Sequence, residues 1–337
     1  MEVIPGWTHQ AFEVRDLSSV GEARRHVARL CSERQWGEVD AARAALVATE
    51  LGTNLAKHAL QGQLLIAARD PFGDIEILSA DAGPGIADVA RAMRDGVSTA
   101  STAGNGLGAV RRQSDEFDLH STLQEGTVCV ARVRPGATGL RPPASFSFGA
   151  VCVPLRGETQ CGDSWVVVLD GDRAALMVAD GLGHGPEAAQ ASQAAVAVFS
   201  ARAFEPVDAC LQAVHTALRT TRGAAVSALW LQGDEVLCAG AGNVAGRLIS
   251  GTEDKSVLTQ HGTLGLMARS FKPSAMTRPA HSTALLHTDG IASRWSSEAL
   301  RPLLRRDPVL LALRIHADHS RGRDDVCVLV ARPEEAA

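Results

Sequence analysis

The stretch Val178-Ala179-Asp180-Gly181-Leu182-Gly183-His184-Gly185-Pro186-Glu187 lies near the middle of the 337-residue chain. The apolar run 174–179 predicts a buried strand, and Pro186 predicts the start of an alanine-rich helix that reaches about Ala203. A glycine-rich loop between a strand and a helix can hold a phosphate at the helix N-terminus, or a cation on the strand-end carboxylate. The local sequence leaves both ligands open.

Length and composition predict a cytoplasmic protein of two domains. A chain of 337 residues exceeds one ordinary domain of about 150 residues, and 45% apolar with 21% charged residues is typical of a soluble globular protein. The net charge of -5, with both signs mixed along the chain, favours neither nucleic acid nor a membrane surface as a partner. No apolar run approaches the roughly 20 residues that span a bilayer, and the first residues lack the order of a signal peptide.

The cysteines of the chain number seven and are scattered singly, without a C-x-x-C pair. Most of them lie inside apolar runs. This pattern indicates free, buried thiols, and it favours neither a disulfide framework nor a zinc site.

The first half begins with two predicted helices, the first capped by Ser18 or Ser19 and the second by Asp40. The second helix carries polar side chains about one turn apart, namely Glu50, Asn54, Lys57 and His58. A carboxylate and an amide stacked in this way can share a ligand, although an isolated E-x-x-x-N more often marks a solvated face. Two strands, 63–69 and 74–80, follow as a hairpin around the turn Asp70-Pro71-Phe72-Gly73.

Three motifs of the first half occur in a fixed order, Glu50-x-x-x-Asn54, Asp81-x-Gly83-x-Gly85 and Gly104-x-Gly106-x-Gly108. In this order they resemble the N, G1 and G2 boxes of the GHKL (Bergerat-fold, HATPase_c) ATPases. The likeness is greatest to the RsbT-like serine/threonine protein kinases of the general-stress partner-switching pathway. It is carried by Gly83-Pro84-Gly85-Ile86, Ala92-Met93-Arg94-Asp95-Gly96-x-Ser98-Thr99, Gly106-Leu107-Gly108-Ala109-Val110 and Asp115-Glu116-Phe117-Asp118.

This resemblance implies an α/β sandwich, a mixed sheet with helices on one face, that binds ATP and Mg²⁺. It assigns the following roles by position. Asn54 would hold Mg²⁺ against the phosphates, with His58 among the nucleotide-binding residues, Asp81 would bind the adenine amino group, and Gly83 and Gly85 would let the base approach. Gly104, Gly106 and Gly108 would form a phosphate lid at a helix N-terminus. Glu50 would take the proton from an attacking serine or threonine hydroxyl, or would only orient Asn54.

The stretch 132–143 combines Gly, Pro and Arg without a period and predicts a linker, which we place at 135–144. It separates a first domain, residues 1–134, from a second, residues 145–337. The second half contains predicted strands at 146–153, 165–169, 174–179, 226–231, 236–239, 244–249, 284–287 and 326–332. A helix starting at Pro186 and another over 207–220 divide these strands into two runs, which favours two antiparallel sheets flanked by helices.

Aspartates fall repeatedly at the ends of these strands, at Asp163, Asp180, Asp289, Asp324 and Asp325. Several carboxylates converging at one end of a sheet would repel one another unless cations lay among them. Such hard oxygen ligands select Mg²⁺ or Mn²⁺. Any one of these aspartates beside glycine is ordinary turn chemistry, and only their number makes a metal site the better interpretation.

The second half resembles the SpoIIE/RsbX branch of the PPM superfamily of metal-dependent serine/threonine phosphatases. The matching stretches are Cys161-Gly162-Asp163-Ser164-Trp165, Asp180-Gly181-Leu182-Gly183-His184-Gly185, Ala239-Gly240-x-Gly242-Asn243, Thr288-Asp289-Gly290 and Arg323-Asp324-Asp325. The resemblance implies an α-β-β-α sandwich with two Mn²⁺ or Mg²⁺ ions, held by Asp163, Asp180, the Gly181 carbonyl, Asp289 and Asp324, which activate a bridging water for attack on phosphorus.

Three assignments in this half stay open. Asp325 could be a metal ligand or a partner of one, and His184 could be a general acid or only the cap of the helix that follows. No arginine can be assigned to the phosphate from the sequence.

The two resemblances together imply a bifunctional partner-switching regulator, a kinase joined to a phosphatase. The implied substrate is a serine or threonine of a STAS-domain protein, either an anti-sigma antagonist or a stressosome subunit, so that the output is control of a sigma factor or another stress signal. Further implied partners are an anti-sigma factor or an activating phosphatase, and kinases of this class can form homodimers. The alternative is a phosphatase gated by a first half that binds nucleotide or sequesters a partner without phosphoryl transfer.

Overall fold

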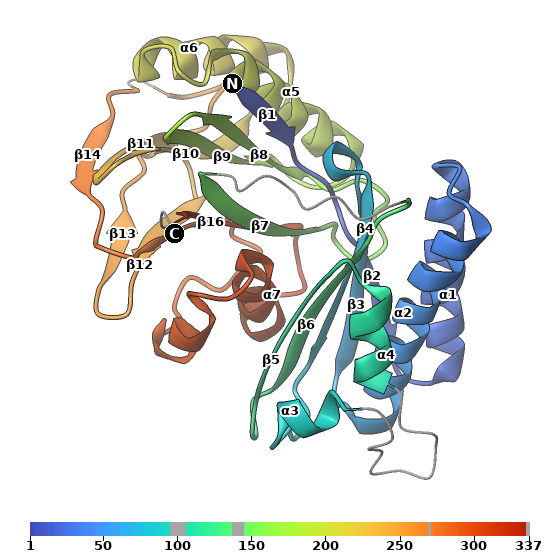
Figure 1. Ribbon diagram of the computed structural model, residues 1–337. Helices are drawn as coiled ribbons and strands as arrows, with labels where there is room; N and C mark the ends of the chain where they lie inside the picture. Colours follow the sequence, from blue (N-terminus) through green and yellow to red (C-terminus); the bar gives the residue numbers. More distant parts are fainter. Residues whose placement is uncertain (95–105, 137–144, 269–270, 335–337) are drawn as a thin grey trace. The chain divides into compact units, whose positions relative to one another are not determined.

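The computed structural model describes residues 1–94, 106–136, 145–268 and 271–334, and the chain divides into two compact units (Figure 1). One unit is His9–Pro142, and the other combines Met1–Thr8 with Pro143–Ala337. We expected residues 1–134 to form the first domain. Its first residues instead belong to the other unit, because Glu2–Pro5 pairs there as a strand.

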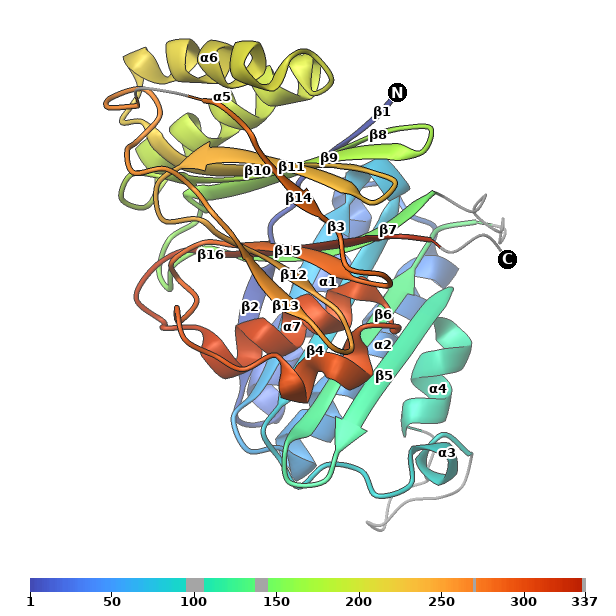
Figure 2. The ribbon, with the colours of Figure 1, turned by 90° about the vertical axis from the view of Figure 1, so that its left-hand side faces the viewer.

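The unit His9–Pro142 is a five-stranded sheet with helices on one face (Figures 1 and 2). Its elements are β2 (Gln10–Val14), α1 (Leu17–Glu33), α2 (Glu38–His58), β3 (Gly62–Arg69), the 3-10 turn Asp70–Phe72, β4 (Asp74–Asp81), α3 (Val89–Ala92), α4 (Gly106–Gln113), β5 (Glu116–Thr122) and β6 (Gly126–Val133). The strand order is β2-β3-β4-β6-β5, and each neighbouring pair is antiparallel. We expected a mixed sheet, but the α1–α2 pair and the β3–β4 and β5–β6 turns each reverse the chain between neighbouring strands.

The caps of the first two helices differ from the expectation. Asp16 is the N-cap of α1, and Ser19 completes a capping box with it from the third helical position. Gly37 is the N-cap of α2, so Asp40 lies inside the first turn, where it accepts hydrogen bonds from Arg43 and from the backbone N–H of Gly136. Asp40 therefore ties the end of this unit to its helix layer.

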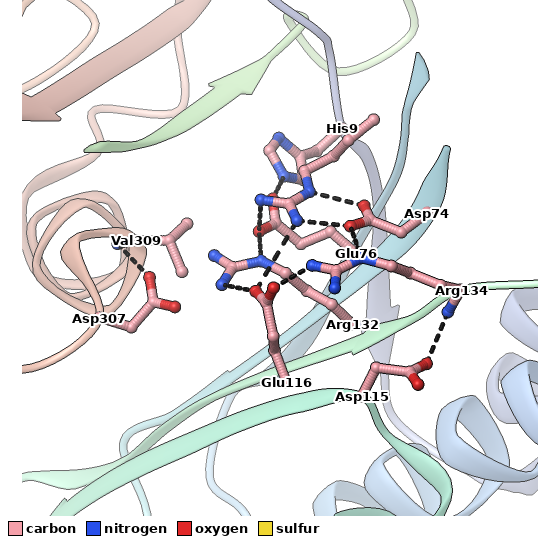
Figure 3. A network of polar contacts seen from close by, with 10 residues as sticks. His9, Asp74, Glu76, Asp115, Glu116, Arg132, Arg134, Asp307 and Val309 are labelled. Atoms are coloured by element: carbon pink, nitrogen blue, oxygen red, sulfur yellow. Dashed lines mark hydrogen bonds and ion pairs between the residues drawn. The ribbon is translucent and has the colours of Figure 1, made fainter. Parts of the chain in front are cut away.

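The two faces of the five-stranded sheet have different chemistry. Because side chains alternate along a strand, β4 directs Ile75 and Ile77 into the apolar core beneath the helices and Asp74 and Glu76 to the opposite face. On that opposite face the charges form a network, in which Arg132 Nε donates to Glu76 at 2.6 Å (Figure 3). Arg69 Nη2 donates to Asp74, also at 2.6 Å.

Every charge of this buried network has a partner of opposite sign. Burial raises the pKa of Glu76, but Arg132, Arg69 and a hydrogen bond to His9 outweigh it and leave that pKa below its ordinary value. Buried charges are tolerated only when they are paired in this way. The alternation of charged and apolar residues in β4 was the sequence signal for this second face.

The other unit consists of two sheets with helices outside them (Figure 1). Its elements are β1 (Glu2–Pro5), β7 (Phe146–Val153), β8 (Asp163–Asp170), β9 (Arg173–Gly181), α5 (Pro186–Arg202), α6 (Val207–Ala217), the 3-10 helix Leu218–Thr220, β10 (Ala224–Gln232), β11 (Glu235–Ala241), β12 (Ala245–Ile249), β13 (Asp254–Val257), β14 (Ser274–Thr277), β15 (Thr283–His287), the 3-10 helix Glu298–Leu303, α7 (Pro308–His319) and β16 (Val326–Pro333).

These strands form the order β1-β8-β9-β10-β11-β14 in one sheet and β13-β12-β15-β16-β7 in the other, with antiparallel pairs throughout. Helices α5 and α6 pack on the first sheet, and α7 packs on the second. The expected α-β-β-α sandwich is confirmed. The seven cysteines of the chain are free and buried, as the sequence predicted.

The edge strand β1 is fixed to β8 by backbone and side chain. Its register pairs Ile4 with Val167, and the N–H of Gly6 then donates to the carbonyl of Trp165 at 2.9 Å. The ring of Trp7 packs edge-on against that of Trp165, with centroids 4.6 Å apart. The segment Met1–Thr8 is therefore part of the sandwich core and edge. No helix in the described ranges has both the length and the apolar character needed to cross a membrane.

Candidate functional site

The predicted metal aspartates of the sandwich begin with a pair on neighbouring strands. Asp163 opens β8 and Asp180 lies near the end of β9, and the antiparallel register sets their Cα atoms opposite each other. Asp163 is buried, and its Oδ2 accepts a hydrogen bond of 2.7 Å from the hydroxyl of Thr288. Thr288 Oγ1 in turn accepts the N–H of Cys327 at 2.9 Å. Thr288 thus connects the second sheet to the aspartate of the first.

The charges of the five aspartates act on one another. Burial raises the pKa of Asp163 well above its usual range, and Cys161 and Asp180 add to the shift. Burial, and then the charges of Asp289, Asp324 and Asp325, raise the pKa of Asp180 to about 7. The structure therefore brings together the aspartates that the sequence had placed at separate strand ends.

This cluster fits hard divalent cations. Its donors are carboxylate oxygens and a backbone carbonyl, which are the ligands that Mg²⁺ and Mn²⁺ prefer, and a cation among them would remove their mutual repulsion. Within the described parts of the chain, no three His, Cys, Asp or Glu side chains are grouped closely enough to hold one ion as they stand. The fit of this cluster to divalent cations therefore rests on its oxygen donors and on the repulsion between its carboxylates, and not on metal–ligand distances.

The remaining aspartates have distinct partners. Asp289 accepts a hydrogen bond of 2.5 Å from the side-chain amide of Asn243, and Asp324 accepts the N–H of Asp325 at 2.9 Å. Both oxygens of Asp325 accept backbone N–H groups, from Leu155 at 2.7 Å and from Gly162 at 2.9 Å. Asp325 therefore fastens the segment that leads into Asp163.

Glycine is required at two positions here because the backbone packs closely. A Cβ at Gly181 would lie 2.0 Å from the carbonyl oxygen of Ala188, and one at Gly162 would lie 2.6 Å from Asp325 Oδ2. The N–H of Gly181 donates to the carbonyl of Gly162 at 3.1 Å. These glycines let the start of α5 lie against the strand ends.

His184 does not cap the helix that follows it. The N-cap of α5 is Gly185, which makes no side-chain capping bond, and His184 Nδ1 lies 2.6 Å from Glu158 Oε1. The side chain of His184 is 56% exposed at the surface of the loop. Glu158, which no sequence motif contains, is thus the partner of His184.

The predicted nucleotide residues of the other unit come together around α2. Glu50 and Asn54 lie one turn apart on this helix, and α4 begins over them at Gly106. A Cβ at Gly106 would lie 3.4 Å from Asn54 Oδ1 and 3.7 Å from Glu50 Oε2. Two of the three motifs therefore meet at one place. Gly104 lies outside the described residues, whereas Gly108 is buried within α4.

The third motif follows the end of β4. Asp81 Oδ1 accepts the N–H of Gly83 at 2.7 Å, which closes a tight turn after the strand. A Cβ at Gly83 would lie 3.1 Å from the carbonyl oxygen of His58, so this turn packs on the C-terminal end of α2. The side chain of His58 is exposed there. Gly85 has a φ of +74°, and a Cβ on it would lie 2.2 Å from the carbonyl oxygen of Thr122, so only glycine fits.

Comparison with protein families gives one match in each half. Residues 14–132 match the histidine kinase-like ATPase domain, and residues 170–334 match the stage II sporulation protein E (SpoIIE) family. The matches cover the nucleotide residues from Glu50 to Gly108 and the aspartates from Asp180 to Asp325. Asp163 precedes the second match.

Two characterised proteins of Bacillus subtilis (strain 168) are similar to the chain. The serine/threonine-protein kinase RsbT is 38% identical over 115 residues, which are 33% of this chain and 84% of RsbT. The phosphoserine phosphatase RsbX is 30% identical over 139 residues, which are 40% of this chain and 69% of RsbX.

Two solved structures resemble part of the chain in fold. A protein of the bacterial stressosome, described as a modular system adapted to control secondary messenger signalling, has a TM-score of 0.53 and 29% identity over 56% of this chain and 100% of its own. RsbX in complex with magnesium has a TM-score of 0.51 and 23% identity over 58% of this chain and 98% of its own.

Proposed function

Because the chain belongs in its first half to the histidine kinase-like ATPase family of RsbT and in its second half to the SpoIIE family of RsbX, we propose that it both adds phosphate to a partner protein and removes it. The observation that carries this proposal is the presence in one chain of two separate sets of site residues, one around Asn54 and one around Asp180. We further propose that the working domains are the unit around residues 9–134 and the sandwich of residues 145–337, with β1 as part of the sandwich.

The phosphatase step assigns roles to the aspartates. Asp163, Asp180, the Gly181 carbonyl, Asp289 and Asp324 would hold two Mn²⁺ or Mg²⁺ ions, which when bound lower the pKa of a water and neutralise phosphate charge. Thr288 orients the carboxylate of Asp163, and Asn243 orients that of Asp289, through the hydrogen bonds described above. We propose that His184, whose Nδ1 contacts Glu158, donates a proton to the leaving serine oxygen.

The kinase step assigns roles to the residues around α2. Asn54 would hold Mg²⁺ of bound ATP, Asp81 would accept the adenine amino group, and Glu50 would take the proton of the attacking hydroxyl. The meeting of Gly106 with Asn54 and Glu50 supports this assignment, because the phosphate lid must close over the residue that holds the metal. RsbT, the relative of this half, is named as a serine/threonine-protein kinase.

The substrate that we propose is a serine or threonine of a STAS-domain protein, an anti-sigma antagonist or a stressosome subunit. The similarity to a stressosome protein and to RsbX supports this class of partner. Control of a sigma factor or of a related stress output would follow from the phosphorylation state of that partner, through an anti-sigma factor or an activating phosphatase.

One experiment tests both halves. A STAS-domain protein is co-expressed with the wild type, with Asn54→Ala or with Asp180→Ala, and its phosphorylation is measured by mass spectrometry. We expect the phosphate to be lost with Asn54→Ala, because ATP is no longer used, and to accumulate with Asp180→Ala. An unchanged phosphate level with Asp180→Ala would reject the phosphatase assignment.

We propose as the alternative function a phosphatase that the first half regulates. The chain passes between the two units once after Thr8 and once near Pro142. On this alternative the first half binds ATP or ADP and gates the phosphatase without transferring phosphate. Nucleotide-dependent phosphatase activity that is unaffected by Glu50→Ala, with no phosphorylation of the partner, would favour it.

A further inference from the structure

The loop that follows Asp180 has an arginine beside it that the sequence could not assign. Strands β9 and β10 pair Asp180 with Ala225 and Gly181 with Ala224. The pairing continues beyond the strands, since the N–H of Leu182 donates to the carbonyl of Gly223 at 3.1 Å. This register sets Arg222 opposite Gly183, within the turn between Asp180 and the start of α5.

The guanidinium of Arg222 lies against the loop backbone. A Cβ at Gly183 would lie 3.1 Å from Arg222 Nη1, and Gly183 has a φ of +87°, which few other residues adopt. The backbone that carries Arg222 is itself fixed, because Thr221 Oγ1 donates to the carbonyl of Leu218 at 2.8 Å and accepts the N–H of Gly223 at 3.0 Å. The guanidinium therefore lies beside Gly183, two residues after the candidate ligand Gly181.

The present partner of this charge is readily exchanged. Arg222 forms an ion pair with Glu187 in the first turn of α5, and the two side chains are 50% and 65% exposed. Ion pairs this exposed contribute little to stability. A phosphoryl group carries more charge than one carboxylate and offers several oxygens to the fork of a guanidinium. Glu158, an acid that also lies beside this loop, is paired with His184.

We propose that Arg222 binds the phosphoryl group of the phosphatase substrate and that Glu187 competes with this group for the guanidinium. The inference rests on the proposed phosphatase function. On this inference the Glu187 carboxylate occupies the guanidinium of Arg222 between turnovers and thereby weakens substrate binding. Removing the Arg222 side chain should therefore weaken phosphate binding, and removing the Glu187 carboxylate should strengthen it.

The test uses the full chain with Mn²⁺, para-nitrophenyl phosphate as substrate and inorganic phosphate as inhibitor. Arg222→Ala is expected to raise the KM and the inhibition constant of phosphate about tenfold, with little change in kcat, because a charge-assisted hydrogen bond to the ground state is lost. Glu187→Gln is expected to lower both constants by about two- to fivefold. Arg222→Lys should recover part of the loss, since the charge remains. Arg219→Ala is the matched control, because Arg219 is exposed in the preceding 3-10 helix.

Calorimetric titration of inorganic phosphate into the Mn²⁺-loaded protein measures the same contact without turnover, so it separates this inference from the proposed activity. Weaker phosphate binding by Arg222→Ala, with a native circular dichroism spectrum, supports the inference even if no turnover is seen. Equal phosphate affinity in the wild type and in Arg222→Ala overturns it. A fall in kcat at constant KM also overturns it, because Arg222 would then act on the loop and not on the phosphoryl group.

Discussion

Asp180 links the metal corner to the stability of the fold. Its pKa is about 7 in the folded protein against an ordinary value of 3.8, so the folded, metal-free protein keeps a proton that the unfolded chain releases. The stability that this proton provides is complete below about pH 4 and is lost as the pH rises to about 7. With EDTA present, we expect the free energy of unfolding of the wild type to fall by about a few kcal/mol relative to that of Asp180→Asn as the pH rises through this window.

Urea unfolding of the two proteins across this pH range, with and without Mn²⁺, checks this expectation. Mn²⁺ should restore the stability of the wild type at the upper end of the pH range, because the cation then neutralises the charge of the carboxylates. Asp172→Asn serves as the control, since Asp172 is exposed in the β8–β9 turn. The prediction would be contradicted if, in EDTA, the free energies of unfolding of the wild type and of Asp180→Asn changed equally with pH.

Thr288 offers a test that leaves every candidate ligand in place. Thr288→Val removes the hydroxyl that donates to Asp163 and accepts the N–H of Cys327, but it keeps the shape of the side chain. Because partners of metal ligands orient them, we expect Mn²⁺ affinity to fall by about tenfold, with the fold retained. Thr216→Val, on the exposed side of α6, should leave the affinity unchanged, as measured by calorimetric titration of Mn²⁺. Equal Mn²⁺ affinity in Thr288→Val and the wild type would show that Asp163 needs no such support.

The sequence could identify the acidic residues of the site but not the groups that hold them. Asp163 and Asp180 stand beside glycines at strand ends, and this local pattern is visible without a structure. The hydrogen bond from Thr288 to Asp163 and the pairing of Arg222 with Glu187 join residues that are far apart in the chain. No local spacing reports such contacts, since they depend on the register of β8, β9, β10 and β16.

At the scale of elements, the long buried strands and helices were predictable and the short edges were not. Strands β7, β9 and β16 each contain a run of buried, mostly apolar residues, and their positions are confirmed. Strands β1, β13 and β14 have four residues each, are largely exposed, and lie at or next to the edges of their sheets. Their identity depends on the neighbour that they pair with, and their own residues carry almost no periodic signal. Helix α7, buried along most of its length, also lacked a clear apolar stripe.

The crossing of Gly6 over Trp165 gives a prediction for strand β1. A Cβ at Gly6 would lie 2.5 Å from the carbonyl oxygen of Trp165 and 2.9 Å from its ring. Gly6→Ala is therefore expected to push β1 off β8 and to destabilise the sandwich by about 1–3 kcal/mol. Gly251→Ala is the matched control in the same unit, because no atom lies within 4 Å of its added Cβ. Urea unfolding followed by tryptophan fluorescence compares the two, and equal midpoints would refute the prediction.

At the scale of the whole molecule, the sandwich is assembled from two separate parts of the chain. A protein limited to residues 145–337 retains every candidate metal aspartate but lacks β1 and the packing of Trp7 on Trp165. We expect it to unfold several degrees below the sandwich of the full chain, because a buried aromatic contact and a strand edge are lost. Adding a peptide of residues 1–8 should raise its Tm in a concentration-dependent way. A Tm that does not respond to the peptide would show that β1 is dispensable.

The pairing of Glu2–Pro5 with β8 also sets the order of events on the ribosome. The first strand of the sandwich is synthesised before the nucleotide unit, yet its partner Leu169 emerges only after that entire unit has been made. Domains generally fold as they are synthesised, so His9–Pro142 can fold while Met1–Thr8 still has no sheet to join. The six-stranded sheet therefore cannot add β1 at its edge until β8 has been made, which is after the whole unit His9–Pro142 has been synthesised.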